Sequence, residues 1–343
     1  MAHPRSAASS TRPRLVSRRF VAVWAALASV VVLVTGCTTE PIDTGAGTAA
    51  ATKPTLRSGP TTATLPHPDI VPVVTDPTPG PRADRIIALD RNGTLGSIVF
   101  ALGLGPHVVG RDRSTTFPSA GDLPYVTETG HAINPERVLA QNPSIVLVTD
   151  DATPPGSVEQ LRAAGIAVEV FTGKRSIAGN SALITDVARA LGVPDAGAAL
   201  VARTEKQIAD ARALVPDPSE DPTIGFLYIR GPHLILLAGP RSGADDLIAA
   251  LGGIDAGTKA GLTSAFTQVS AESMIRADPE VILVMTQGAE SVGGMDAVLR
   301  LPAVADTDAG RHGRIVEMDE TQILMFGPDT GLVLGALAKA IYA

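Results

Sequence analysis

Short apolar runs alternate with longer amphipathic segments from about residue 85 to the C-terminus. The apolar runs have the length and composition of buried strands and lie at 85–89, 108–110, 145–149, 168–171, 223–228, 234–238, 281–285 and 315–318. The amphipathic runs have helical spacing and lie at 94–102, 135–141, 156–164, 177–191, 196–214, 243–251, 270–277, 295–299 and 330–341. This alternation predicts an α/β protein with parallel sheets covered by helices.

An internal repeat divides this pattern in two. NPERVLAQNPSIVLV (134–148) and SAESMIRADPEVILV (270–284) share a Glu at the third position, Glu136 and Glu272, a Pro seven residues later, and a strand that ends in Leu-Val. A repeat on this scale predicts two similar α/β lobes, which we place at 84–191 and 219–343.

One long, helical segment connects the two lobes. Its apolar pattern covers 196–214, follows Val193-Pro194, and defines a connecting region at 192–218. We expect a stiff helical hinge, with an ordinary packing helix of one lobe as the alternative. Two lobes joined in this way leave a cleft, and clefts between domains are the usual place for small ligands.

The N-terminus has a different composition. Residues 1–36 contain five arginines and no acid, and an apolar run at 20–34 leads to Thr35-Gly36-Cys37. This order predicts a secretory signal peptide and a lipid attached to Cys37, the chain's single cysteine. A retained membrane anchor is the alternative, but its apolar run would be shorter than the roughly 20 residues that a spanning helix needs.

Residues 37–83 are rich in Thr, Pro, Gly and Ala without sustained apolar periodicity, so we expect a flexible tether after the lipidated Cys37. The whole chain has a formal charge of −7, and removal of the signal arginines makes the mature chain more negative. An acidic chain argues against a nucleic-acid partner. It also leaves membrane contact to the lipid anchor.

Motifs of common enzyme classes are missing from the sequence. It contains no GxSxG, Walker P-loop, HExxH or CxxC pattern, and its histidines are scattered along the chain. A dedicated zinc or manganese site would require several clustered ligands. We therefore expect a protein that is not an enzyme.

Two side chains could hold an iron-containing ligand. Tyr228 lies near the end of a predicted strand, and Arg230, two residues on, shares its face. A guanidinium beside a phenol favours the phenolate, and tyrosinate is a known axial ligand of haem iron. His131 lies at a junction between a loop and a helix, where a neutral imidazole could be a second ligand. The alternatives are a half-buried strand-end tyrosine and a loop or capping histidine.

The motifs TGHAINPERVLAQNP, LYIRG, GGMDAVLRLPAVADTDAGR and RIVEMDETQILMFGP resemble the substrate-binding lipoproteins of ABC importers for iron complexes and vitamin B12. Within that family they are most similar to the haem-binding proteins of Gram-positive haem uptake systems. The resemblance covers nearly all of residues 84–343 and implies the class III periplasmic-binding-protein fold, with two Rossmann-like lobes joined by a single long helix.

The resemblance also implies roles for individual residues. His131 and Tyr228 would bind haem iron from opposite lobes, and Arg230 would support the tyrosine. Glu136 and Glu272 would contact the permease. One position departs from the family pattern: Asp329 stands where an arginine follows Gly-Pro, which argues against a contact between this stretch and a haem propionate.

The sequence thus leads to one function hypothesis and three alternatives. The hypothesis is a monomeric haem-binding lipoprotein on the extracellular face of the cell membrane, which delivers haem to an ABC permease and its ATPase. A corrinoid or ferric-siderophore binding protein of the same fold is the main alternative. An exported, lipid-anchored enzyme and a haem scavenger without a permease are the others.

Overall fold

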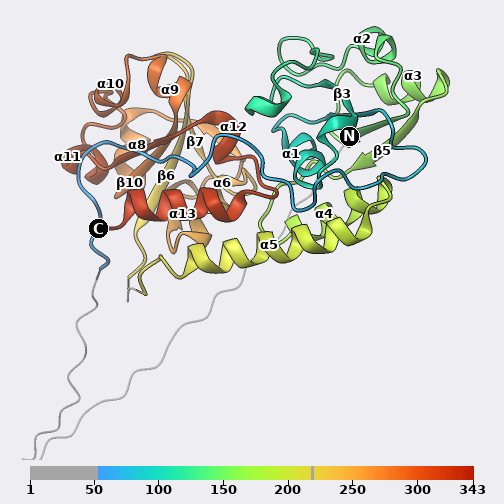
Figure 1. Cartoon of the computed structure of the whole chain (residues 1–343). Coiled ribbons are helices and arrows are strands. Elements are labelled where there is room, and N and C mark those ends of the chain that lie inside the picture. Colours follow the sequence, from blue (N-terminus) through green and yellow to red (C-terminus); the bar gives the residue numbers. More distant parts are fainter. Residues whose placement is uncertain (1–52, 218–219) are drawn as a thin grey trace, which may run out of the picture. The chain divides into compact units, whose positions relative to one another are not determined.

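The computed structural model describes residues 53–217 and 220–343, which form two α/β lobes (Figure 1). The predicted signal peptide and Cys37 lie outside the described residues, so lipidation stays a prediction. Among the described helices, none combines the length and the apolar character that crossing a bilayer requires.

The N-terminal lobe is built on a four-stranded parallel sheet with the order β3-β2-β4-β5. Its strands are β2 (Ile86–Leu89), β3 (Val108–Arg111), β4 (Ile145–Thr149) and β5 (Ala167–Phe171). Its helices are α1 (Thr94–Ala101), α2 (Pro135–Ala140), α3 (Ser157–Ala163) and α4 (Asn180–Ala190). Strands β2 and β4 are buried on both faces, because alternate side chains enter two separate apolar clusters.

The C-terminal lobe contains a seven-stranded mixed sheet. Its path is β1 (Thr61–Thr62), β11 (Ile315–Met318), β10 (Val281–Met285), β6 (Thr223–Ile229), β7 (Ile235–Ala238) and β9 (Phe266–Gln268), with β8 (Ile254–Asp255) beside β6. The prediction of parallel strands covered by helices is confirmed for β1, β11, β10, β6 and β8, whereas β7 pairs antiparallel with β6 and with β9. A direct turn at Gly231, with φ of 72°, joins β6 to β7 and is too short for a parallel crossover.

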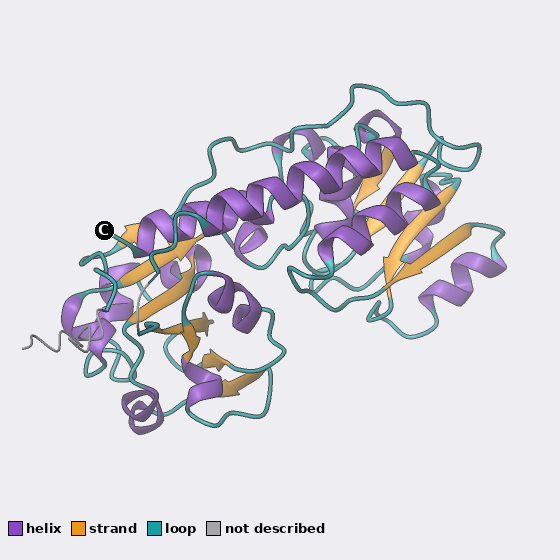
Figure 2. Ribbon diagram, turned by 90° about the horizontal axis from the view of Figure 1, so that it is seen from below, coloured by secondary structure: helices purple, strands orange, loops and turns teal. Residues whose placement is uncertain are grey.

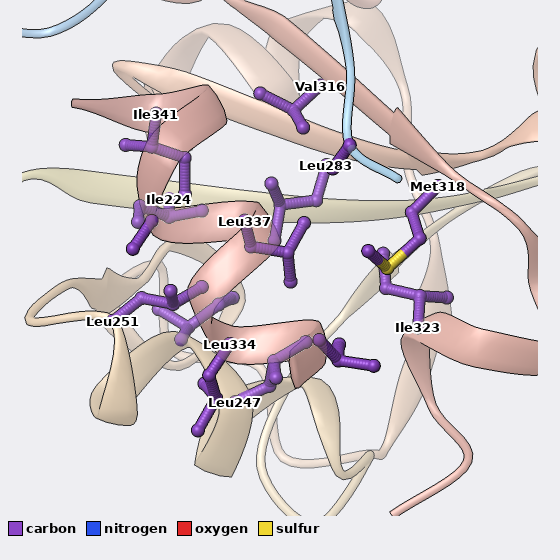
Figure 3. Close-up of a cluster of buried hydrophobic side chains, with 14 of the residues drawn as sticks. Ile224, Leu247, Leu251, Leu283, Val316, Met318, Ile323, Leu334, Leu337 and Ile341 are labelled. Atoms are coloured by element: carbon purple, nitrogen blue, oxygen red, sulfur yellow. The ribbon is translucent and has the colours of Figure 1, made fainter. Parts of the chain in front are cut away.

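The helices of this lobe are α6 (Ala244–Ala250), α7 (Ala256–Lys259), α8 (Ala271–Ala277), α9 (Thr286–Glu290), α10 (Met295–Leu299), α11 (Asp308–His312), α12 (Glu320–Ile323) and α13 (Thr330–Ile341). Figure 3 shows the side of the core that α13 covers, where Leu337 lies near Leu283 of the sheet. Burying each such leucine stabilises the fold by about 1.5–3 kcal/mol.

The helix that joins the lobes is α5 (Pro194–Arg212), which begins two residues before the predicted start because Pro194 occupies its first turn. It packs against α4 of the first lobe and α13 of the second (Figure 2). Glycines allow both close approaches. A Cβ on Gly197 would lie 2.4 Å from Ala188, and one on Gly331 would lie 2.4 Å from the backbone of Gln207.

Residues 53–83, named the strap from here on, differ from the predicted flexible tether. Strand β1 of the strap pairs with β11, and the backbone N–H groups of Val73 and Gly80 donate to carbonyl oxygens of the first lobe at 2.8 Å. The side chains of Ala63 and Ala83 are buried. The tether prediction is therefore corrected for this part, because surfaces of the folded lobes supply the burial that the strap's own sequence cannot.

Candidate ligand-binding site

A cleft of about 710 Å³ lies between side chains of the two lobes. Its volume is within the range of 300–1,000 Å³ that is typical of small-molecule sites. The sequence-predicted residues His131, Tyr228 and Arg230 all line it. The first lobe also contributes Arg91, Asn92, Arg113 and Ser114, and the second contributes Leu236, Phe266, Met285, Gln287, Glu320, Thr321 and Leu324.

His131 lies on a tight turn. Its N–H donates to the carbonyl oxygen of Glu128 at 3.1 Å, and Thr127 pairs with Ile133 across the turn. Gly130 and His131 both have left-handed backbone, with φ of 84° and 69°. A left-handed conformation costs a residue other than glycine about 1–2 kcal/mol. Such strain in a residue that lines a cleft points to a functional side chain.

The imidazole of His131 is half-buried and lies beside Ser114. Its Nδ1 is 3.2 Å from Ser114 Oγ, which also lies 2.7 Å from the carbonyl oxygen of Arg91. Burial lowers the pKa of His131, and the positive charges of Arg91 and Arg113 lower it further, against the opposing effect of Asp90. The lowered pKa favours the neutral imidazole, which is the form that binds metals.

Tyr228 belongs to β6, between β10 and β7 in the sheet. Its half-buried ring makes an edge contact with Phe266, with centroids 6.1 Å apart. The guanidinium carbon of Arg230 lies 4.5 Å from the centroid of the tyrosine ring, as strand periodicity predicts. Among the described residues, no hydrogen-bond partner meets the Tyr228 hydroxyl, which therefore remains available to a ligand in the cleft.

Arg230 also approaches Glu320 of α12. Its Nη1 donates to the carbonyl oxygen of Ile229 at 3.0 Å and lies 4.0 Å from Glu320 Oε1. Burial raises the pKa of Glu320, and the nearby charge of Asp319 raises it further. The cleft thus carries three guanidinium groups, from Arg91, Arg113 and Arg230, against this single carboxylate. This balance favours an anionic ligand.

Two buried carboxylates hold the loops that carry Arg91 and Ser114. Asp90 accepts backbone N–H groups from α1 and its cap, and an Arg175 Nη2 donor at 2.9 Å. Asp112 accepts from the N–H of Ser114 at 2.9 Å and from that of Asp90 at 2.8 Å. Burial, together with the negative charge of Asp90, raises the pKa of Asp112 to about 7.

Four residues that line the cleft were not predicted from the sequence: Arg91, Arg113, Ser114 and Glu320. The first three lie in loops directly after β2 and β3, at the carboxyl ends of parallel strands, which is where α/β proteins bind ligands. That position was the available signal. Glu320 follows β11 in the same way.

Glu136 and Glu272 lie outside the cleft, at equivalent places in the two lobes. Each is exposed and occupies the second position of its helix, α2 or α8. The side chains of Asn134 and Ser270 accept from the N–H three residues later and cap the two helices. Glu272 also pairs with Arg276 at 2.8 Å. The sequence repeat therefore corresponds to a structural repeat.

Asp329 lies away from this cleft. It lines a smaller cavity of about 250 Å³ under the strap, where burial raises its pKa despite the charges of Arg203 and His67. Within the described residues, no group of three or more His, Cys, Asp or Glu side chains could hold a bare metal ion.

Comparisons with known proteins agree with this architecture. A family model described as "Periplasmic binding protein" matches residues 87–321. A cobalamin-binding protein of Halobacterium salinarum is 25% identical over 76% of this chain and 69% of its own length. A Bacillus subtilis protein, the uncharacterized ABC transporter substrate-binding lipoprotein YvrC, is 24% identical over 75% of this chain and 80% of its own.

Solved structures give a closer match. The crystal structure of the haem-binding protein HmuT has a TM-score of 0.77 and 30% identity, covering 83% of this chain and 98% of HmuT. The periplasmic haem-binding protein RhuT from Roseiflexus sp. RS-1 has a TM-score of 0.69 and 40% identity, covering 75% of this chain and 97% of RhuT. These relatives are binding proteins rather than enzymes. With its two helix-joined α/β lobes and the cleft between them, the chain belongs to the periplasmic binding protein family.

Proposed function

We propose that this protein binds haem in the cleft and delivers it to an ABC permease. The observation that carries the proposal is that His131 and Tyr228, from different lobes, line one cleft together with Arg230. A porphyrin between them would present its iron to a nitrogen ligand on one face and an oxygen ligand on the other.

The chemistry of the three side chains suits ferric haem. Tyrosinate and histidine are both established axial ligands of haem iron. The Arg230 guanidinium lies 4.5 Å from the Tyr228 ring centroid and so places a positive charge beside this candidate ligand. Phe266, Leu236 and Leu324 add apolar surface for the porphyrin.

The charge of the cleft favours haem over a corrinoid. Haem carries two carboxylates, whereas the corrinoid periphery carries mostly neutral amides. Arg91 and Arg113 are exposed in the cleft, and arginine binds carboxylates through paired, charge-assisted hydrogen bonds. The solved relatives add support, since HmuT and RhuT are both named as haem-binding proteins. The relatives named for cobalamin keep corrinoid binding as the competing function.

The proposal includes export and anchoring. Cys37 would carry a lipid on the extracellular side of the membrane, and the protein would act as a monomer. The name of the Bacillus subtilis relative, a substrate-binding lipoprotein of an ABC transporter, supports this part. Glu136 and Glu272 would contact the permease, one from each lobe.

Titration with three ligands tests the choice of cargo. Hemin, cyanocobalamin and a ferric siderophore are added to the purified protein, and absorbance and heat are recorded. We expect saturable hemin binding with a shifted Soret band, and no comparable binding of the other two ligands. Tighter binding of cyanocobalamin or the siderophore would replace haem as the proposed cargo.

A double variant tests delivery to the permease separately. Glu136→Ala with Glu272→Ala should keep wild-type haem affinity, because both side chains are exposed and outside the cleft. Haem-dependent growth of cells that rely on this protein should fall strongly. Arg276→Ala, which removes only the partner of Glu272, is the matched control. Undiminished growth of the double variant would indicate a scavenger without this docking contact.

A further inference from the structure

Ser114 occupies a position between two fixed groups in the first lobe. Its Oγ lies 2.7 Å from the carbonyl oxygen of Arg91 and 3.2 Å from Nδ1 of His131. A carbonyl oxygen can only accept, so the single hydroxyl proton of Ser114 goes to Arg91. The remaining contact requires a proton on the other atom, and His131 Nδ1 must therefore donate to Ser114 Oγ.

The surroundings hold Ser114 in this arrangement. Its side chain is buried, and its N–H donates to Asp112 Oδ1 at 2.9 Å. Asp112 is fully buried and also accepts from the N–H of Asp90, the residue before Arg91. The hydroxyl and the carbonyl that orients it are thus tied to the same buried carboxylate. The acceptor for His131 is in place before any ligand binds.

A proton on Nδ1 decides which nitrogen can bind a metal. A neutral imidazole has one N–H and one free lone pair, so the Nδ1–H tautomer leaves the lone pair on Nε2. Ligating histidines commonly donate their other N–H to a protein acceptor, which fixes both tautomer and ring orientation. Here a serine hydroxyl, polarised by its own hydrogen bond to Arg91, is that acceptor.

We infer that Ser114 is a positioning residue that holds His131 in the Nδ1–H tautomer and so presents Nε2 to haem iron. The inference rests on the proposed haem-binding function and adds to it a residue that does not touch the iron. Replacing the outer partner of a ligating histidine typically weakens metal binding by about 10- to 100-fold. For Ser114→Ala we expect the lower end, about tenfold, because the Tyr228 side of the cleft is unchanged.

The tautomer can be measured without haem. In the ligand-free protein, two-bond ¹⁵N–¹H correlation spectra distinguish a protonated from an unprotonated ring nitrogen, and His131→Ala identifies the signals. We expect Nδ1–H in the wild type and in Ser114→Thr, which keeps the hydroxyl, and a shift toward Nε2–H in Ser114→Ala. A wild-type His131 with Nε2–H, or an unchanged tautomer in Ser114→Ala, would overturn the inference whatever the cargo is.

Haem spectra then test the consequence. Wild type and Ser114→Thr should give one six-coordinate ferric spectrum, and Ser114→Ala should move toward the five-coordinate spectrum of His131→Ala. In a double-mutant cycle, Ser114→Ala should weaken hemin binding about tenfold in the wild type and have no further effect in the His131→Ala background. An equal loss in both backgrounds would mean that Ser114 acts on general structure and would overturn the inference. If the wild type binds no hemin but has the expected tautomer, the cargo proposal fails and the positioning role for iron fails with it.

Discussion

The two walls of the cleft present their candidate iron ligands in different ways. Tyr228 belongs to a strand that pairs with neighbours on both sides, so sheet hydrogen bonds fix its backbone. His131 lies on a turn with left-handed backbone and depends on Ser114 and the buried Asp112 behind it. The second lobe thus offers a rigid ligand, whereas the first lobe offers one that a series of hydrogen-bonded side chains must support.

The largest expected loss of hemin affinity comes from replacing Tyr228, the ligand that the sheet of the second lobe holds rigidly. Tyr228→Ala should weaken hemin binding by more than about 100-fold, since it removes the anionic ligand and not merely one of its supports. Hemin titration followed by the Soret band measures it. Tyr228→Phe is the matched control, because it keeps the ring beside Phe266 and removes only the hydroxyl. Wild-type affinity in Tyr228→Phe would show that the ring matters and the phenolate does not.

On the wall that carries His131, the buried Asp112 should make the stability of the protein depend on pH. Burial, with the charge of Asp90, raises the folded-state pKa of Asp112 to about 7, well above its unfolded value. The folded protein therefore binds the extra proton between about pH 4 and 7, so this contribution is present below pH 4 and is lost as pH rises through 7. It amounts to an unfolding free energy that falls by a few kcal/mol over that range.

Thermal unfolding of the ligand-free protein from pH 4 to 8 measures this slope. Asp112→Asn should be less stable overall but should have a flatter pH dependence, because its side chain cannot titrate. His131 works in the opposite direction, since its lowered pKa makes stability rise as the pH increases toward the ordinary value of 6.5. An identical slope in wild type and Asp112→Asn would contradict the role given to this carboxylate.

A smaller effect is expected for the ligand of the first lobe. His131→Ala should weaken hemin binding by at least the roughly tenfold expected for Ser114→Ala, but by less than Tyr228→Ala, because Tyr228 still holds the iron. The same titration measures it, and the ferric spectrum should change from six- to five-coordinate. A loss as large as that of Tyr228→Ala would show that the two ligands contribute equally to hemin binding.

The smallest expected effect is on stability, and it comes from the backbone conformation of the turn at His131. His131→Gly and His131→Ala both remove the imidazole, so their hemin affinities should agree. Their stabilities should differ, since glycine adopts a φ of 69° without the cost of about 1 kcal/mol that alanine incurs. Chemical denaturation of the ligand-free variants measures the difference. Equal stabilities would mean that the turn is not strained by its histidine.

Regular elements with strong periodicity were predictable from the sequence. The strands expected at 145–149 and 281–285 agree with β4 and β10, and the helix expected at 330–341 agrees with α13. The short strands β1, β8 and β9 were not predicted, because two or three residues carry no periodicity and form only against a partner. The ordered structure of the strap was not predicted for the same reason, because it depends on pairing with the lobes that the strap crosses.

The site was predictable only in part. Tyr228 and Arg230 were linked by strand spacing, and His131 was singled out by its place beside the repeat and by family resemblance. The only signal for Ser114 was its place just after a predicted strand, because the two groups that its hydroxyl contacts are distant in sequence. The approach of Glu320 to Arg230 could not be predicted either, because it depends on the packing of α12.

The strap has a consequence for how the protein behaves among copies of itself. Strand β11 carries buried apolar side chains, including Ile315 and Val316, and would be the outer strand of its sheet without β1. An outer strand with unpaired N–H and carbonyl groups is a template for pairing with another chain. Proteolysis that removed residues up to Thr62 would therefore leave β11 as an unpaired edge strand. The truncated protein would be prone to aggregate although the residues that line its cleft were still present.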